Sequence, residues 1–409
     1  MRPDAAGPDE PAMPRSTGSP GEVFLAFLRL GLTSFGGPIA HLGYFRDELV
    51  VRRRWIDEAG YADLVALCQF LPGPASSQVG FALGLLRAGP LGALAAWAAF
   101  TLPSALLLVL FAYGATLFEG PAGAGLLHGL KLVAVAVVAQ AVWGMARALT
   151  PDRQRAGIAL LSVFAVSFIP GASGQVAAIA LGAAAGLWLC RRLPVNPVGH
   201  LTFRVPKPIG VLALLVFALL LVGLPALTAV SASQEVALFD AFYRAGALVF
   251  GGGHVVLPLL EAALVQPGWV SADAFLAGYG AAQAVPGPLF SFAAYLGAAM
   301  GAAPSGLAGA GLALVAIFLP GLLLVVGALP FWDAWRARPL AQAAMRGANA
   351  AVVGVLAAAL YDPVWTSAIT APVDFALALT GFLLLTVWKA PPWIVVLAVG
   401  AAGALLALA

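Results

Sequence analysis

The stretch LPGPASS at Leu71–Ser77 decides how this chain of 409 residues folds, because it returns 214 residues later as VPGPLFS at Val285–Ser291. Each copy interrupts a long apolar run with a Pro-Gly-Pro triplet, which a helix interior does not tolerate. Proline is pre-organised for the first position of a helix, so each triplet is predicted to end one half-helix and to open the next. The residues of the two predicted breaks are Pro72, Gly73, Pro74, Pro286, Gly287 and Pro288.

The repeat extends well beyond the prolines. Helix breakers, aromatic residues and ionisable residues recur in the same order and at almost the same offset. The matched pairs are Phe27 and Phe242, Arg29 and Arg244, Gly31 and Gly246, Phe35 and Phe250, Gly36 and Gly251, Gly37 and Gly252, His41 and His254, Trp55 and Trp269, and Gln69 and Gln283. Duplication of such residues in apolar surroundings predicts a transporter built from two related halves.

The composition places this chain in a membrane. Hydrophobic residues make up 62% of it, charged residues 10%, and the mean hydropathy is +0.96. A soluble protein carries charge on about a quarter of its residues. Several apolar runs, such as 91–118 and 209–230, exceed the ~20 residues that a membrane-spanning helix needs. The net charge of +3 is too small and too scattered to indicate nucleic-acid binding.

Four regions are predicted. Residues 1–21, rich in Pro, Gly, Ser and Asp, form a disordered tail, and residues 22–192 form the first repeat. Residues 193–235 form a linker that contains one transmembrane helix, and residues 236–409 form the second repeat. The two cysteines, Cys68 and Cys190, imply neither a disulfide framework nor a metal site.

Each repeat is predicted to contain two interrupted elements followed by four continuous helices. The interrupted elements are 23–51 and 59–87 in the first repeat, and 240–264 and 272–302 in the second. The continuous stretches are 89–118, 122–149, 156–169 and 174–190, then 305–330, 342–360, 368–388 and 391–408. Each side of a break is too short to span the membrane, so a half-helix pair that dips in and returns is expected. Two short tilted crossings are the alternative.

Basic residues predict the orientation, because Lys and Arg collect in cytoplasmic loops. Arg52–Arg54 and Arg87 flank the second interrupted element, whereas 245–304 contains no Lys or Arg. Five crossings precede the second repeat if the interrupted elements do not cross. Five is odd, so the repeats are predicted to be inverted, with a cytoplasmic N-terminus and a periplasmic C-terminus. The expected fold is therefore an all-α polytopic membrane protein with two inverted homologous repeats, broken at Gly-Gly and Pro-Gly-Pro and joined by one extra helix.

The helix starts after the two triplets are candidate anion sites. A helix start carries unpaired N–H groups and the positive end of the helix dipole. These amides belong to Ala75–Gln78 and Leu289–Ser291, and the hydroxyls of Ser76, Ser77 and Ser291 add further donors. The alternative is that each triplet forms only a structural turn. Such a turn is common for a single Pro-Gly-Pro triplet and less common for two matched copies.

Cationic and amide side chains are further substrate-binding candidates. Arg29 and Arg244 lie within apolar stretches, where a guanidinium needs a wet cavity or an anion; snorkelling to an interface is the alternative. Lys131 is also intramembrane and has no charged counterpart in the other repeat. Gln69 and Gln283 precede the two triplets and could donate to an oxyanion.

The Gly-Gly breaks allow two interpretations. Gly36, Gly37, Gly251 and Gly252 could bring the backbone close to a ligand, or they could serve only the close packing of helices.

A coupling proton requires a group that titrates in the membrane. His41 and His254 are each followed seven residues later by an acid, Glu48 and Glu261, and seven residues is close to two helical turns. Asp63 lies inside an interrupted element. These residues are candidates for proton coupling. For the two glutamates, an interfacial charge at a helix end is the favoured alternative.

The motifs FLRLG at Phe27–Gly31, SFGGP at Ser34–Pro38, LPGP at Leu71–Pro74, FGGGH at Phe250–His254 and VPGP at Val285–Pro288 together resemble the chromate ion transporter family, in its long two-repeat form. The resemblance covers the chain from about residue 22 to its end. It implies a bacterial inner-membrane protein that exports chromate on the proton gradient and so confers chromate resistance, with sulfate as a competitor. The expected partners are chromate, protons and the lipid bilayer; a homodimer is left open.

Three other functions remain as alternatives. The same scaffold could import sulfate or another oxyanion, since no residue evidently separates it from chromate. A passive anion channel would not move its substrate uphill. An integral-membrane enzyme would need a metal, haem or nucleophile cluster, which four histidines and two isolated cysteines do not provide. No metal or other cofactor is expected.

Overall fold

The computed structural model describes residues 18–114, 120–169, 171–191, 205–231, 233–250, 253–336 and 338–408. These residues form helices and connecting turns, and they contain no β-strand, so the predicted all-α class is confirmed. The predictions for residues 1–17, and for Gly251 and Gly252, lie outside the described residues.

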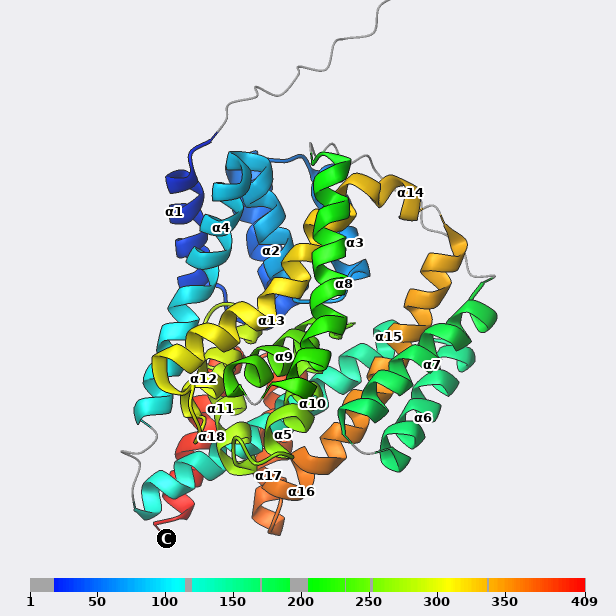
Figure 1. The fold of residues 1–409 in the computed structure, drawn as a ribbon. Coiled ribbons are helices and arrows are strands. Elements are labelled where there is room, and N and C mark those ends of the chain that lie inside the picture. Colours follow the sequence, from blue (N-terminus) through cyan, green and yellow to red (C-terminus); the bar gives the residue numbers. More distant parts are fainter. Residues whose placement is uncertain are drawn as a thin grey trace, which may run out of the picture.

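The helices follow the two predicted copies (Figure 1). In the first copy they are α1 (Pro20–Thr33), α2 (Gly37–Phe45), α3 (Glu58–Phe70), α4 (Ala75–Gly114), α5 (Pro121–Leu149), α6 (Arg153–Phe168) and α7 (Ala172–Leu189). The connecting helix is α8 (Lys207–Val230). In the second copy they are α9 (Gln234–Ala247), α10 (Val256–Leu260), α11 (Ala272–Ala282), α12 (Phe292–Ala299), α13 (Gly306–Ala328), α14 (Trp332–Arg336), α15 (Pro339–Ala359), α16 (Thr366–Ala368), α17 (Pro372–Thr386) and α18 (Pro392–Leu406). Turns of π- or 3₁₀-helix extend them at Arg46–Arg52, Gly253–Val255, Glu261–Val265, Leu289–Ser291, Leu329–Phe331 and Leu360–Trp365.

The chain breaks where the sequence predicts. α1 and α9 have 14 residues each, α3 has 13 and α11 has 11, and each ends just before its predicted break. All are shorter than the ~20 residues of a full crossing. The predicted boundary between 59–87 and 89–118 is also observed, because Ala88 and Gly89 have non-helical φ and ψ and divide α4 into two helical parts at a kink.

The interrupted segments of the first copy begin and end at one end of the molecule. The Arg87 guanidinium at the kink of α4 pairs with Glu22 near the start of α1, at 3.1 Å. Arg53, which follows α2, and Arg87 both lie over the Trp55 ring, just before α3 begins. The starts of α1 and α3 and the ends of the α2 segment and of the first part of α4 therefore meet there. Each segment descends to its break and returns, as a half-helix pair does.

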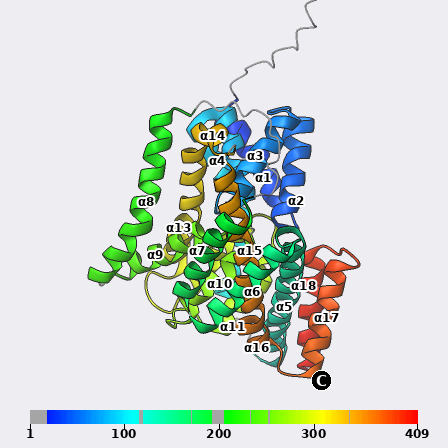
Figure 2. The ribbon, with the colours of Figure 1, turned by 90° about the vertical axis from the view of Figure 1, so that its right-hand side faces the viewer.

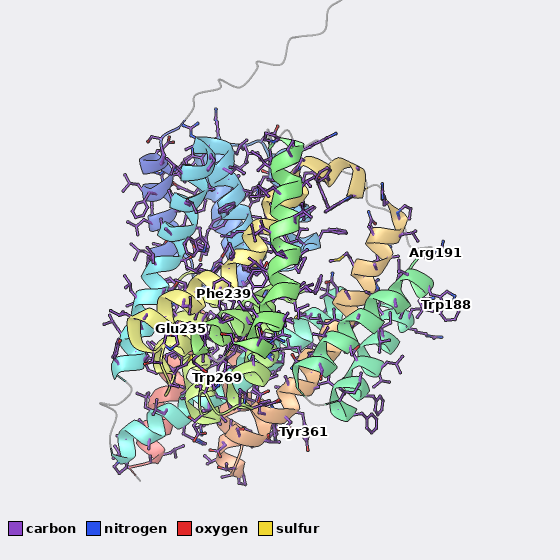
Figure 3. All side chains as sticks on the ribbon, in the orientation of Figure 1. Trp188, Arg191, Glu235, Phe239, Trp269 and Tyr361 are labelled. Atoms are coloured by element: carbon purple, nitrogen blue, oxygen red, sulfur yellow. The ribbon has the colours of Figure 1, made fainter. Side chains whose placement is uncertain are left out.

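The second copy contains a similar returning pair, formed by α11 and α12. The Gly301 amide after α12 donates to the carbonyl of Trp269, just before α11, so this pair also returns to its starting level. Trp269 lies in the lower part of the molecule in Figure 3, whereas α1, α2 and α3 lie in the upper part of Figure 1.

The long helices hold the copies together by exchanged contacts. α5 packs against α17 and α18 of the second copy, and its counterpart α15 packs against α6 and α7 of the first. Among the described residues, five helical segments are long and apolar enough to span a membrane: Ala75–Gly114, Pro121–Leu149, Lys207–Val230, Gly306–Phe331 and Pro339–Ala368. Of these, α8 stands apart at one side of the molecule (Figure 2) and exposes most of its apolar side chains.

Candidate functional site

The breaks of the two copies meet and exchange a matched pair of backbone hydrogen bonds. The Gly73 amide donates to the Val249 carbonyl, with an N···O distance of 2.7 Å. The Gly287 amide donates to the Ser34 carbonyl at 3.0 Å. Gly73 corresponds to Gly287, and Ser34 corresponds to Val249, so each Pro-Gly-Pro turn rests on the first break of the other copy. The candidate site is therefore built from both copies.

Two long helices close around these turns because the turns carry no side chain. A Cβ on Gly73 would lie 3.1 Å from Cα of Gly321 in α13. A Cβ on Gly287 would lie 2.8 Å from the Ser104 Oγ of α4. Both glycines also have positive φ, +123° and +107°, which side chains disfavour.

Buried polar atoms without partners gather around this junction. The atoms are Oγ of Ser34, Nε2 of His41, Oγ of Ser77, Oε1 of Gln78 and Oγ1 of Thr101, and all five residues are at most 2% exposed. An unpaired buried polar group costs roughly 1–3 kcal/mol, and most such groups in proteins find a partner. Five together at the meeting point of two breaks indicate a place kept ready for a polar ligand or water.

The surrounding hydroxyls are held in place. Ser291 Oγ lies 2.6 Å from Ser104 Oγ, and the Ser104 hydroxyl is 2.9 Å from the Thr101 carbonyl that it donates to. Ser76 Oγ lies 3.4 Å from Nδ1 of His41. The predicted hydroxyls of Ser76, Ser77 and Ser291 are thus all buried at the breaks.

The prediction of free amides after the triplets needs one correction. The Gln78 N–H donates to the Pro74 carbonyl, and the Ser291 N–H donates to the Pro288 carbonyl. Both amides already belong to the new helix, so they are unavailable to an anion.

A small crevice opens beside the junction, at the start of α2. Gly36, Gly37 and Pro38 face His254 and Gln283 across it. Its volume is about 20 Å³, room for about one water molecule. This crevice is therefore too small for a tetrahedral oxyanion.

The predicted cations do not converge on the junction. The Arg29 side chain is exposed. It lies on the same face of α1 as the exposed Leu25 and Leu32, away from the buried face of this helix. Gln69 is also exposed. The Lys131 ammonium is paired with Asp273 of α11 at 2.8 Å. In this conformation all three lie outside the cluster of buried polar atoms.

Arg244 is held by a carboxylate of its own helix. Its Nε and Nη2 atoms donate to the two oxygens of Asp240, at 2.9 and 2.6 Å. The Asp240 side chain is only 3% exposed, whereas that of Arg244 is 42% exposed. The guanidinium therefore neutralises a buried carboxylate.

We expect Arg244→Ala to destabilise the protein by about 1–3 kcal/mol, because it leaves the Asp240 carboxylate buried and unpaired; half-exposure of the arginine reduces the effect. The midpoint of thermal unfolding in detergent measures this, and adding Asp240→Asn should restore most of it. Arg29→Ala, the matched position in the first copy, should change stability by less than about 0.5 kcal/mol. Equal losses at the two positions would contradict this role for Asp240.

The proton-coupling candidates differ between the copies. Nδ1 of His41 faces Ser76, whereas Nδ1 of His254 lies 2.6 Å from the Tyr279 hydroxyl. The Glu48 carboxylate forms ion pairs with both Arg52 and Arg53, at N···O distances of 2.8 and 2.6 Å.

The other two acidic candidates, Glu261 and Asp63, also differ in their surroundings. Glu261 is partly buried, and its side chain makes no hydrogen bond or ion pair within the described part of the chain. Asp63 is buried and accepts a hydrogen bond from Nε1 of Trp332, at 3.2 Å. The arrangement leaves the two histidines next to the breaks and places Glu48 in ion pairs with Arg52 and Arg53.

Sequence reasoning missed the contribution of the kinked long helices. Thr101 and Ser104 flank Pro103 in α4, and the matched proline in α13 is Pro320, next to Gly321. A third pair of matched prolines was the available signal for these positions.

A chain with two copies of a broken-helix unit, whose breaks meet among long apolar helices, has the architecture of a polytopic membrane transporter. The chain belongs to the chromate transporter family, whose sequence profile matches residues 21–232 and again residues 236–404.

Named relatives support this assignment. The chain is 31% identical over 336 residues to the "Probable chromate transport protein" of Synechococcus elongatus, covering 82% of each chain. It is 27% identical to the chromate transport protein of Cupriavidus metallidurans, covering 89% of this chain and 87% of that one. It is 28% identical to that of Pseudomonas aeruginosa, covering 93% and 91%. No solved structure matches the chain.

Proposed function

We propose that this protein carries chromate across a membrane through the junction of the two breaks. The observation that carries the proposal is the pair of exchanged hydrogen bonds, Gly73 to Val249 and Gly287 to Ser34, beside buried hydroxyls that lack partners. Chromate is a tetrahedral dianion, and hydroxyl and N–H donors in a dry site bind such an ion strongly. The names of the relatives support chromate as the substrate.

Inverted orientation of the copies gives the junction a way to open to either side. The first copy enters from the end that carries Arg53 and Arg87, and the second enters from the opposite end. The basic end is cytoplasmic, so the N-terminus lies inside and the C-terminus lies in the periplasm. The helices α6 and α7 are short. If neither crosses the membrane, the number of crossings before the second copy falls by two and stays odd, so the copies remain inverted.

Export of chromate is driven by the proton gradient across a bacterial inner membrane, which gives the cell chromate resistance. His41 and His254 are the candidate proton carriers, because both lie beside the breaks. The Nδ1 atom of each faces a hydroxyl, of Ser76 or Tyr279, which can donate or accept a hydrogen bond and so suits either tautomer of the ring. Glu48 is a weaker candidate, since two guanidinium groups already hold its charge.

The test is transport by the purified protein in proteoliposomes with an imposed pH gradient. We expect chromate to accumulate against its own gradient, and an uncoupler to abolish the accumulation. Sulfate added in excess should compete. Liposomes without protein provide the baseline.

The other outcomes separate the alternatives. Uphill movement of sulfate with no movement of chromate would identify a sulfate transporter. Downhill flux of chromate that never becomes uphill would identify a channel, and would contradict proton coupling.

A further inference from the structure

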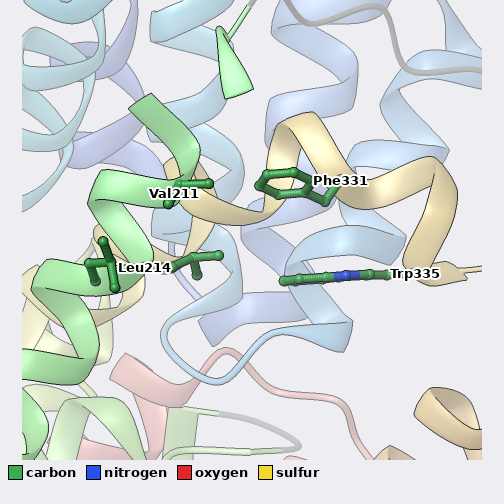
Figure 4. A pocket seen from close by; sticks show the side chains of 5 residues that line it. Val211, Leu214, Phe331 and Trp335 are labelled. Atoms are coloured by element: carbon green, nitrogen blue, oxygen red, sulfur yellow. The ribbon is translucent and has the colours of Figure 1, made fainter. Parts of the chain in front are cut away.

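An apolar groove lies between the connecting helix α8 and the segment that enters α14 (Figure 4). Val211, Leu214 and Leu215 line one wall, and Phe331 and Trp335 line the other. Its volume is about 360 Å³, far larger than the crevice beside the breaks. The groove belongs to the outer side of the molecule and not to the junction.

The groove is open to whatever surrounds the protein. Val211 is 46% exposed and Leu215 is 62% exposed, and α8 stands at the side of the molecule in Figure 2. An exposed apolar groove on a membrane protein faces lipid chains or another protein.

Each wall of this groove is followed or preceded along the chain by an exposed cation, Lys207 before Val211 and Arg338 after Trp335. Lys207 lies one turn before Val211 on the same face of α8, since residues four apart share a face. Arg338 lies just beyond Trp335, and its backbone N–H donates to the Trp335 carbonyl. Both side chains are exposed, and neither makes a hydrogen bond or ion pair within the described residues.

We propose that the groove binds an anionic phospholipid, with an acyl chain along Val211, Leu214 and Trp335 and the phosphate near Lys207 and Arg338. The rise from Lys207 to Leu215 is roughly 12 Å, which fits within the ~15 Å depth of one leaflet. Tryptophan favours this interfacial level, and basic pockets between membrane helices bind anionic headgroups.

Charge argues against a second copy of the chain as the occupant. In a two-fold dimer the same surface faces itself, so the Lys207 and Arg338 charges of both copies would gather at one interface. Like charges placed together oppose association. A phosphate at this position neutralises them instead.

Trp335 allows a direct test, because brominated acyl chains quench tryptophan fluorescence on contact. The protein is placed in phosphatidylcholine vesicles that contain dibrominated phosphatidylglycerol or, separately, dibrominated phosphatidylcholine. The fluorescence of Trp335 is obtained by subtracting the signal of the Trp335→Phe variant from that of the unmodified protein. The Trp365→Phe variant gives the fluorescence of Trp365 in the same way. Trp365 lies in the turn that extends α15, away from the groove, and serves as the control. Quenching of Trp335, and not of Trp365, should favour the anionic lipid, by roughly five-fold in affinity for each cation.

Variants of the cations complete the test. Lys207→Gln and Arg338→Gln should each reduce the preference roughly five-fold while leaving the thermal midpoint in detergent unchanged. Equal quenching of Trp335 by the two lipids in the unmodified protein would overturn the proposal. Absence of quenching, together with disulfide cross-linking of Val211→Cys between copies, would also overturn it and would assign the groove to a protein interface.

Discussion

Replacing Gly73 or Gly287 with alanine is expected to reduce chromate transport by more than about tenfold while the protein still inserts in the membrane. Each glycine has a positive φ, where a Cβ adds roughly 1–2 kcal/mol of strain, and each approaches a long helix of the other copy. An energy of ~1.4 kcal/mol is already a factor of ten in an equilibrium. The added methyl group separates the amide from its carbonyl acceptor and so disturbs the junction. Initial rates in proteoliposomes measure the effect.

Gly311→Ala provides the matched control. Gly311 lies in α13, the same helix that Gly73 approaches through Gly321, and a Cβ at Gly311 would meet no atom within 4 Å. Its transport rate should match that of the unmodified protein. Normal transport by both Gly73→Ala and Gly287→Ala would show that the exchanged hydrogen bonds are not needed, and the junction would lose its claim to be the transport site.

The breaks could be predicted from sequence because the information there is local. Pro-Gly-Pro ends a helix through the chemistry of its own residues, and its duplication at Pro72–Pro74 and Pro286–Pro288 needs no tertiary knowledge. The same holds for the apolar composition, which identifies the class of fold. The boundary predicted at Gly89 and Pro90 is equally local, since both residues disfavour a continuous helix and the backbone at Ala88 and Gly89 is non-helical.

The partners of Lys131 and Asp63 could not be predicted, because they come from distant parts of the chain. Lys131 finds Asp273, and Asp63 finds Trp332, more than a hundred residues away. Arg29 and Arg244 occupy matched positions, but only Arg244 has an acid four residues earlier, Asp240. That spacing is visible in the sequence and indicates an ion pair within one helix.

The hydroxyls of Thr101 and Ser104 could not be predicted for a different reason. Ser and Thr are common in apolar helices, where they often bond to their own backbone, so Thr101 and Ser104 carry no distinctive pattern by themselves. Their meaning comes from the contact of Ser104 with Ser291 of the other copy. Only the folded arrangement of the two repeats brings these residues together.

Thr101→Val should weaken chromate binding and, at the same time, leave stability unchanged or raise it. Its Oγ1 is buried without a partner, so replacing it with a methyl group of similar shape removes a desolvation penalty of roughly 1 kcal/mol. A hydrogen bond to a charged ligand is worth about 1.5–3 kcal/mol, which corresponds to roughly a 10- to 100-fold rise in the KM for chromate. Transport kinetics and the thermal midpoint of the same preparation test both effects. Ser77→Ala should behave in the same way.

The two readouts together separate a ligand site from a packing defect. Ser162→Ala is the control, since the Ser162 hydroxyl is equally buried but donates to the Ile158 carbonyl of its own helix, away from the breaks. Its removal should leave the KM unaltered. A polar group that serves only the fold lowers stability when it is deleted, whereas one kept for a ligand lowers affinity and spares the fold. If Thr101→Val and Ser77→Ala both keep the normal KM, chromate does not bind at these hydroxyls, and the unpartnered atoms require another explanation.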